Sequence, residues 1–267
     1  MDLELLISTM HLNDYSILEK MNIQSKAIII NQCDENKHEE FYYNGNPIKF
    51  LSFAERGVGL SRNNALMRST GDICLMADED MIYVDNYKEK VINAFKRNPK
   101  ADIIMFNVPI HKKDGHTIEK VEKDGRVRFY NVLKYGTVNI AFRRESVTKN
   151  NLFFSLLFGG GACYGSGEDS IFIVESIKKG LKIYSCKDVI AEIEENGSTW
   201  FEGYNENYFF DRGALFQAIG GNAFSLFLIT QFLLRKRKLY VNELRTKEVF
   251  KEMIKGRKDF IKKGKAT

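Results

Sequence analysis

Short apolar runs alternate with amphipathic stretches along most of the chain. The apolar runs are rich in β-branched residues, which is typical of buried strands, and they cover residues 3–8, 27–31, 48–51, 73–76 and 103–106. The amphipathic stretches predict helices over residues 14–21, 61–69 and 86–97. This alternation predicts an α/β fold with a mostly parallel, doubly wound sheet. Ligands of such sheets bind beyond the carboxyl ends of the strands.

The pattern changes after residue 110. A charged stretch over residues 111–130 predicts turns around a short hairpin, and residues 137–142 resume a strand. A glycine-rich stretch, 159–167, leads into a helix over residues 169–179 that Gly180 ends, and residues 181–184 form another strand. We therefore expect one catalytic domain over residues 1–210.

The remaining residues, 211–267, are expected to form a helical, basic extension. Residues 214–234 carry no charge, and from Arg235 onward 13 Lys and Arg face 4 Asp and Glu, so the tail accounts for more than the net charge of +5. An apolar helix beside Arg235–Lys238 favours either an anionic membrane surface or packing on the catalytic domain. Because residues 214–234 include several polar side chains, a true membrane span is less favoured. The tail has no nucleic-acid-binding signature, so we expect no nucleic-acid partner.

The four cysteines are widely spaced, and no Cys-x-x-Cys pair occurs. A zinc ribbon or a thioredoxin-like site is therefore not expected. The first residues carry Asp2 and Glu4 and no basic segment, so they predict a strand, not a signal peptide. We expect reduced thiols and a cytoplasmic protein, either free or peripheral at the inner face of the membrane.

Two carboxylates follow the apolar strand at residues 73–76. Asp78 and Asp80 are two residues apart, so in an extended chain they project to one side while Glu79 projects to the other. Three adjacent acids repel one another unless a cation or a helix terminus balances them. Carboxylate oxygens suit Mg²⁺ or Mn²⁺. An acidic turn that caps the next helix is the alternative.

Two further segments have the composition of ligand-binding turns. Residues 57–64 place two glycines and Arg62 at a predicted helix start, with Ser61 as the expected N-cap, which suits an anion. The alternative there is an ordinary capped helix with a surface arginine. The glycine-rich stretch leads to Glu168 and Asp169, which the helix macrodipole would stabilise and which would suit a general base.

These three elements occur in one order: Gly-Leu-Ser-Arg-Asn-Asn at 59–64, the strand ending in Asp-Glu-Asp at 73–80, and Gly-Glu-Asp before an apolar helix at 167–177. The ordered set resembles the family 2 glycosyltransferases, and the resemblance covers about residues 1–200. It implies a GT-A fold and transfer of a sugar, with inversion, from a nucleotide-diphosphate donor such as a UDP-sugar. It also implies a hydroxyl acceptor on a saccharide or a lipid-linked saccharide, in polysaccharide or glycolipid assembly.

The resemblance also implies roles for individual residues. Thr9, Asp34 and Arg62 would bind the nucleotide. Asp80 and Asp78 would meet the diphosphate and a divalent Mg²⁺ or Mn²⁺ ion. Asp169 would be the catalytic base, with Glu168 orienting the acceptor.

The sequence departs from the family pattern at the expected histidine ligand of the metal. Residues 192–200 contain no histidine, and Glu195 stands at the corresponding spacing from Ser198. We expect Glu195 to supply an oxygen ligand, or the metal to have one ligand fewer.

Two other classes of protein remain as alternatives. A nucleotidyltransferase for sugar phosphates would need a glycine-rich, basic loop after the first strand, where this chain has residues 8–13 without one. A non-catalytic sugar- or membrane-binding scaffold would not need the four acids at positions 78, 80, 168 and 169.

Overall fold

The computed structural model describes residues 1–194 and 203–264. Its main sheet has nine strands in the order β10-β12-β7-β11-β5-β1-β2-β4-β3. These strands are β1 (Leu3–Met10), β2 (Lys26–Gln32), β3 (Lys37–Tyr43), β4 (Asn46–Phe53), β5 (Ile73–Asp78), β7 (Ile103–Asn107), β10 (Gly125–Arg126), β11 (Ile140–Arg143) and β12 (Ile183–Val189).

Parallel pairing joins β4, β2, β1 and β5, and again joins β7 and β12. Strand β11 runs antiparallel between β5 and β7, and β3 and β10 pair antiparallel at the two edges. The predicted α/β fold is thus confirmed. Its parallel part is interrupted because β11 returns through the centre of the sheet.

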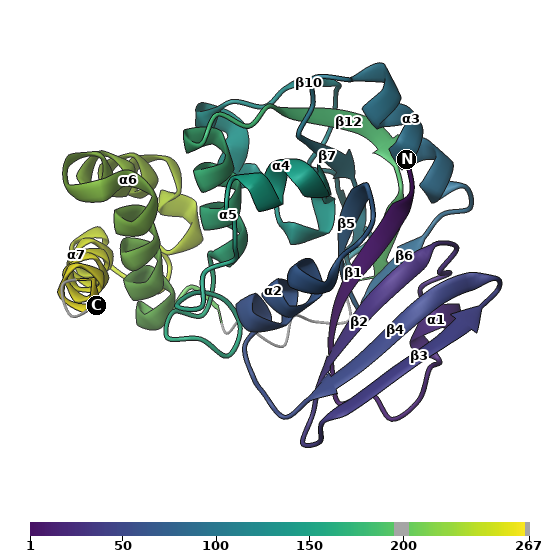
Figure 1. The fold of residues 1–267 in the computed structure, drawn as a ribbon. Coiled ribbons are helices and arrows are strands. Elements are labelled where there is room, and N and C mark those ends of the chain that lie inside the picture. The colour runs from purple at the N-terminus through teal and green to yellow at the C-terminus, as the bar shows by residue number, and fades with distance from the viewer. Residues whose placement is uncertain (195–202, 265–267) are drawn as a thin grey trace.

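The helices cover both faces of the sheet (Figure 1). They are α1 (Ile17–Lys20), α2 (Val58–Arg68), α3 (Tyr87–Arg97), α4 (Arg144–Lys149), α5 (Glu168–Lys178), α6 (Glu206–Arg235) and α7 (Thr246–Lys263). Successive strand residues point to opposite faces: Leu5 packs in the cluster that contains α1 and α3, and Leu6 in the cluster that contains α2, α5, α6 and α7.

A second, four-stranded sheet has the order β6-β13-β8-β9. It is formed by β6 (Met81–Tyr83), β8 (Ile110–His111), β9 (Thr117–Ile118) and β13 (Ala191–Glu194). A hairpin does lie in the charged stretch, formed by β8 and β9, but the first predicted turn connects its two strands and does not flank them. The short 3₁₀ helices are η1 (Phe129–Lys134), η2 (Thr137–Asn139) and η3 (Arg237–Leu239).

Three local predictions need correction. Helix α2 begins at Val58 with Gly57 as its N-cap, so Ser61 is buried inside the helix, where its hydroxyl donates to Ser8 Oγ at 3.0 Å. The strand predicted over residues 137–142 begins as η2, and only its end is β11. The helix predicted over residues 14–21 is a single turn, α1.

The C-terminal helices α6 and α7 cross at two glycines. A Cβ on Gly213 would lie 1.9 Å from the Met253 carbonyl oxygen, and a Cβ on Gly256 would lie 1.8 Å from the Phe210 carbonyl oxygen. Only glycine permits this approach. Helix α6 bends at Gly221 (φ 64°, ψ −162°). The boundary expected after residue 210 lies in the first half of α6, and the division into two domains stays a prediction.

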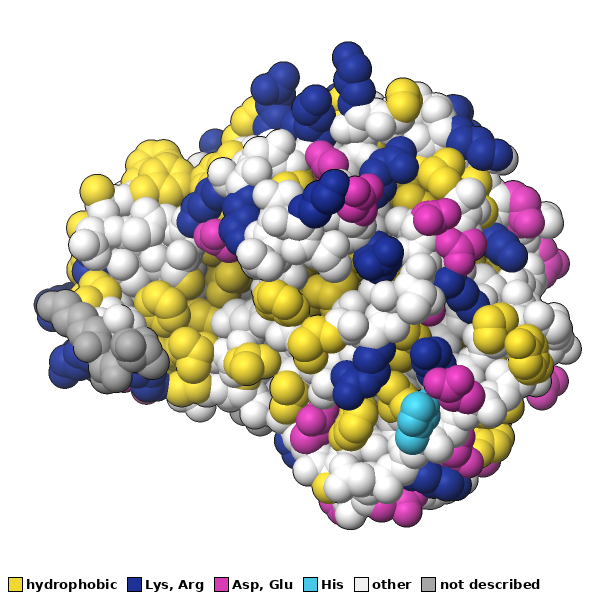
Figure 2. Space-filling view, viewed as in Figure 1, with side chains coloured by type: hydrophobic (Ala, Val, Ile, Leu, Met, Phe, Trp, Pro, Cys, Tyr) yellow, Lys and Arg dark blue, Asp and Glu magenta, His cyan; other side chains and the backbone are white. Residues whose placement is uncertain are grey.

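Helix α6 is the described helix that is long and apolar enough to cross a membrane, by length and composition alone. However, half of its most apolar window is buried against the rest of the protein. Figure 1 shows α4 and α5 lying between the sheet and the C-terminal helices, and Figure 2 shows hydrophobic side chains gathered over the α6 region. Part of α6 therefore belongs to the core, and part of it faces outward.

Candidate active site

The acidic motif lies where β5 leaves the main sheet. Asp78 is the last residue of β5 and is paired in register with Ser8 of β1. Glu79 and Asp80 form a turn into β6, so the chain is not extended beyond Asp78. The prediction that an extended chain aims Asp78 and Asp80 at one point is therefore wrong in its geometry. The charge of Asp78 nevertheless acts on Asp80 and helps to raise its pKa.

Arg62 joins the two acidic segments. Its Nη2 donates to Asp78 Oδ1 at 2.9 Å and its Nη1 donates to Glu168 Oε1 at 2.5 Å. The arginine is only 4% exposed, and its guanidinium lies over the Phe154 ring. Burial opposes its charge, but the charges of Asp78 and Glu168 outweigh burial and raise the pKa of Arg62. Residues 78 and 168, far apart in the sequence, therefore meet at one buried cation.

This placement changes what the sequence suggests for Arg62. The expected nucleotide contact needs an accessible guanidinium, whereas the side chain is buried and its two terminal nitrogens already bind carboxylates. An arginine that balances the buried Glu168 and the half-buried Asp78 is a structural counter-ion, because a carboxylate buried without a partner would be costly. The predicted contact with the nucleotide is not supported by this geometry.

The glycines before Arg62 contact another part of the protein. Val58 N donates to the Gly160 carbonyl oxygen at 3.0 Å, and a Cβ on Gly59 would lie 2.3 Å from the Ser155 carbonyl oxygen. A Cβ on Gly161 would lie 3.2 Å from Gly57 Cα. The close approach expected for a ligand is thus made by Ser155 and by the glycine-rich loop 159–167, which leads to α5. The two glycine motifs pack together and fix the distance between α2 and α5.

Glu168 and Asp169 begin α5, directly after its N-cap Gly167. Glu168 is buried, and its Oε2 accepts from Gly167 N at 3.1 Å while Oε1 binds Arg62. Burial and the charge of Asp169 raise the pKa of Glu168, against the opposing contact with Arg62. Its carboxylate is therefore engaged within the protein, and the predicted role in orienting the acceptor stays a prediction.

Asp169 is half-buried and lies beside an amine that the sequence did not single out. Its Oδ1 accepts from Ser170 N at 2.6 Å. A Cβ on Gly136 would lie 3.3 Å from Asp169 Oδ2 and 3.4 Å from Lys120 Nζ, so Gly136 leaves room between the two groups. Burial lowers the pKa of Lys120, while the charge of Asp169 opposes that shift. Lys120 thus supplies a positive charge close to the predicted base.

Asp80, like Glu79, is an exposed residue of the turn after β5. It has no ion-pair partner among residues 1–194 and 203–264. Partial burial of the carboxylate, followed by the charge of Asp78, raises the pKa of Asp80. An acid whose neighbours are also acids gains most from a bound cation.

Thr9 and Asp34, the other two residues predicted to bind the nucleotide, form hydrogen bonds within the protein. Thr9, in β1, donates through Oγ1 to Glu79 Oε2, which also accepts from Met10 N at 3.3 Å. Asp34 follows β2 and accepts from Arg56 Nη2 at 2.7 Å through an exposed carboxylate. Glu79 therefore fixes the tip of β1, a role that the sequence did not indicate. The contacts predicted for Thr9 and Asp34 with a nucleotide stay predictions.

The described residues hold no group of three or more His, Cys, Asp or Glu side chains that could bind a metal by themselves. Glu195, the predicted further ligand, lies outside the residues that the structure describes. Asp80 and Asp78 remain as oxygen donors. That set fits Mg²⁺ or Mn²⁺ only with a substrate phosphate and water completing the shell, which is how Mg²⁺ is usually held.

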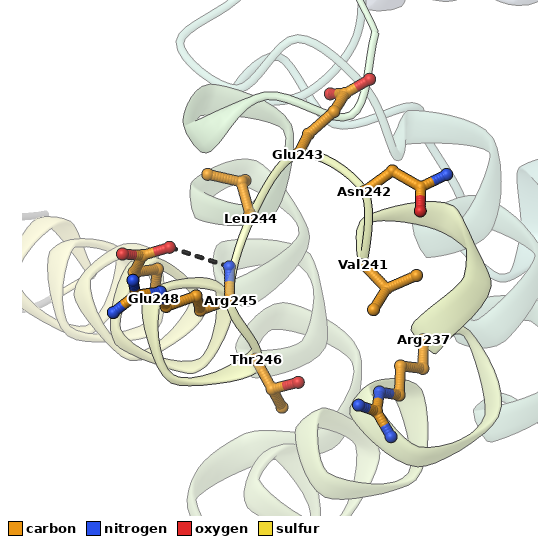
Figure 3. A pocket seen from close by; sticks show the side chains of 8 residues that line it. All are labelled: Arg237, Val241, Asn242, Glu243, Leu244, Arg245, Thr246 and Glu248. Atoms are coloured by element: carbon orange, nitrogen blue, oxygen red, sulfur yellow. Dashed lines mark hydrogen bonds between the residues drawn. The ribbon is translucent and has the colours of Figure 1, made fainter.

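A surface hollow of about 670 Å³ lies elsewhere, between η3 and the start of α7. Figure 3 shows Arg237 and Glu243 among the side chains around it, with Glu248 accepting from Arg245 N at 2.8 Å. That bond satisfies the first turn of α7. The hollow contains none of the predicted site residues, and we assign it no ligand.

Residues 25–157 match the family described as glycosyl transferase family 2. This segment contains Arg62, Asp78 and Asp80, whereas Thr9, Glu168 and Asp169 lie outside it. The comparison with curated proteins gives no match.

Among solved structures, the chain is similar to S. aureus TarS 1–349 in complex with UDP-GlcNAc, with 16% identity and a TM-score of 0.68 over 98% of this chain and 81% of that chain. The complex of the same TarS segment with UDP gives 15% identity and a TM-score of 0.65 over 96% and 81% of the two chains. A longer TarS structure gives 15% identity and a TM-score of 0.65, with 98% of this chain and 49% of that chain covered. At these identities the likeness establishes the fold.

Proposed function

Since the chain belongs to glycosyl transferase family 2 and shares the GT-A fold, we propose that it transfers a sugar from a UDP-sugar to a hydroxyl acceptor with inversion at the anomeric carbon. The choice of UDP is supported by the similar structures, since TarS is described in complexes with UDP-GlcNAc and with UDP. The observation that carries the proposal is the double contact of Arg62 with Asp78 and Glu168. It brings one acid of each predicted pair, Asp78 and Glu168, to the same buried cation.

Different residues would carry out the separate parts of the reaction. Asp80, with Asp78, would hold Mg²⁺ or Mn²⁺. When bound, such an ion would offset the charge that develops on the departing nucleoside diphosphate. Asp169 would accept the proton of the acceptor hydroxyl as that oxygen bonds to the anomeric carbon and the diphosphate leaves from the opposite face. This single displacement inverts the anomeric centre and forms no covalent intermediate with the protein.

Lys120 and Arg62 would act on the charges of this site. Lys120 lies near Asp169 and balances its charge, and the helix start at Glu168 adds the favourable end of the macrodipole. Arg62 forms ion pairs with both Asp78 and Glu168, and these contacts hold the end of β5 and the start of α5 close together. Polysaccharide or glycolipid assembly is the setting that we propose for the acceptor, and the cytoplasmic location stays a prediction.

Release of UDP from a panel of UDP-sugars, with Mn²⁺ or with a chelator, tests the proposal. We expect at least one donor to give UDP in the presence of Mn²⁺ and little UDP with the chelator. Formation of pyrophosphate from UTP and a sugar phosphate would favour the nucleotidyltransferase alternative instead. If no donor gives UDP and calorimetry detects no binding of UDP, the chain is a scaffold and the proposal is wrong.

A further inference from the structure

The second half of α6 exposes large apolar side chains on a face that nothing in the structure covers. Phe227 is 57% and Leu234 is 77% exposed. The opposite face of the same segment is also apolar, with Leu228 and Ile229 buried in the core. A helix that packs on a soluble domain needs only one apolar face. Each exposed Phe or Leu lacks the stabilisation that burial would give. An exposed apolar face of this kind indicates a surface that binds another molecule or a membrane.

The 3₁₀ helix η1 extends this face from another part of the chain. The Phe129 ring lies 5.6 Å from the Phe224 ring, which in turn stacks 5.5 Å from the Phe227 ring. The same short helix exposes Tyr130, by 82%, and Leu133. We call Tyr130, Leu133, Phe224, Leu226 and Phe227 the η1–α6 surface.

Only positive charges accompany the η1–α6 surface in the sequence. Residues 126–134 and 212–242, which contain all of it, include no Asp or Glu. Arg128 and Lys134 flank η1, and the end of α6 runs into Arg235–Lys238; all of these basic side chains are exposed. Figure 2 shows Lys and Arg side chains along the same upper part of the molecule as the hydrophobic side chains over α6. A surface formed by two segments that contain apolar and basic but no acidic residues matches the interface of an anionic lipid bilayer.

We propose that the η1–α6 surface docks the protein onto an anionic membrane, with Phe224, Phe227 and Tyr130 entering the headgroup region. Helix α6 lies on the bilayer in this arrangement and does not cross it, because its buried face packs in the protein core. The sequence pointed to residues 214–234 and the basic tail. In the structure, η1 also belongs to the docking surface. The first half of α6 does not, because its Phe209 and Leu215 are buried.

The docked surface lies close along the chain to the predicted base. Helix η1 ends at Lys134, two residues before Gly136, whose backbone lies against Asp169 and Lys120. A membrane at η1 would therefore be on the acceptor side of the site. Resting on the proposed function, this placement points to an acceptor whose saccharide is carried on a lipid, so that its hydroxyl reaches Asp169 from the bilayer surface.

Vesicle flotation of the full chain tests the docking. The vesicles contain either phosphatidylglycerol with phosphatidylcholine, or phosphatidylcholine alone. We expect the unchanged chain to float with the anionic vesicles and much less with the neutral ones. Phe227→Glu should weaken this binding about tenfold or more, because burial of one Phe side chain is lost. Tyr42→Glu is the matched control: Tyr42 is an exposed aromatic residue of the edge strand β3, 77% exposed and outside the η1–α6 surface, and its variant should float like the unchanged chain.

Three results would overturn the inference. One is flotation of Phe227→Glu equal to that of Tyr42→Glu, and another is equal binding to the anionic and neutral vesicles. The third is a concentration-dependent dimer in sedimentation that Phe227→Glu dissolves, since a second copy would then cover the face. Calorimetric binding of UDP should be the same in both variants, so a failure of docking is distinguishable from a failure of the proposed function. Point variants are used because deletion of α6 would expose core residues.

Discussion

The end of β5 and the start of α5 present the same arrangement twice. Each segment carries neighbouring acids, three after the strand and two at the helix start, and in each the first acid, which we call the inner acid, binds Arg62: Asp78 from the strand and Glu168 from the helix. The outer acids, Asp80 and Asp169, form no ion pair with this arginine. We infer that the inner acids hold the two segments together, whereas the outer acids are available to substrate.

The two segments differ in what surrounds the outer acid. Asp169 has Lys120 nearby and lies at a helix N-terminus, so positive charge faces it. Asp80 has Asp78 and Glu79 as neighbours, and their negative charge acts on it more strongly than the positive charge of Lys20 does. A carboxylate near positive charge has its own charge balanced within the protein, whereas a carboxylate among acids attracts a cation. The same residue type is thus suited to a base in one segment and to metal binding in the other.

Asp169→Asn should have the largest effect on sugar transfer of the variants that compare the two acidic segments. The amide cannot accept the acceptor proton, so we expect sugar transfer to fall roughly 10²- to 10⁴-fold, the usual contribution of a general base. Binding of UDP should be unchanged by calorimetry. Glu168→Gln is the paired variant: it should lower the melting temperature more than Asp169→Asn does, because it weakens a buried contact with Arg62. Equal loss of turnover in both variants would remove the distinction between inner and outer acids.

Arg62→Met should show the cost of removing the shared cation. Asp78 and Glu168 would both lose their partner, and breaking a buried ion pair costs about 3–5 kcal/mol of unfolding free energy. Urea unfolding measures it, with Arg68→Met as the control because Arg68 is an exposed arginine of the same helix. Adding Glu168→Gln to Arg62→Met should restore part of the loss. No restoration would mean that Glu168 is not destabilised by losing Arg62.

Asp80→Asn should weaken binding of UDP in the presence of Mn²⁺ by about tenfold or more, because a charge that attracts the ion is removed. Binding of UDP without Mn²⁺ should change little. Asp72→Asn serves as the control, since Asp72 lies just before β5 at the opposite end of the strand. A titration calorimeter measures all three proteins, and equal binding by Asp80→Asn and Asp72→Asn would contradict the assignment of Asp80.

A smaller effect is expected in the pH dependence of Mn²⁺-dependent UDP binding. The pKa of Asp80 is raised by burial and by neighbouring acids, so protonation begins at a higher pH than for an ordinary Asp. Binding should therefore weaken as the pH falls. Glu79→Gln removes one of the neighbouring charges, and it should move the midpoint to lower pH by less than about one unit. An unchanged midpoint, or the same pH dependence in Asp80→Asn, would show that another group titrates.

The sequence predicted the strands of the sheet because their apolar runs are continuous. A further signal lies at Asn44 and Gly45, which both have positive φ and form the two-residue turn between β3 and β4. That signal predicts the hairpin, and hence the edge strand β3. The start of α2 was placed too late, because Ser61 has the residue type of an N-cap although it is buried in the helix.

The order of the three motifs predicted which segments form the site, but not which residues contact one another. Arg62 and Glu168 are 106 residues apart, and no periodicity or propensity indicates that they pair. Lys120 lies in a charged stretch that resembles a solvated loop, so its position beside Asp169 depends on how that stretch folds over α5. Long-range pairing of this kind comes from tertiary packing, which a single sequence does not display.

The bend at Gly221 determines which way the outer half of α6 faces. With φ at 64° and ψ at −162°, this residue has a backbone conformation that is essentially restricted to glycine. A side chain there would favour a straight helix, which would carry Phe224 and Phe227 away from η1 and break the row of aromatic rings. The backbone of this one glycine therefore determines whether η1 and the second half of α6 form a single continuous surface or two separate ones.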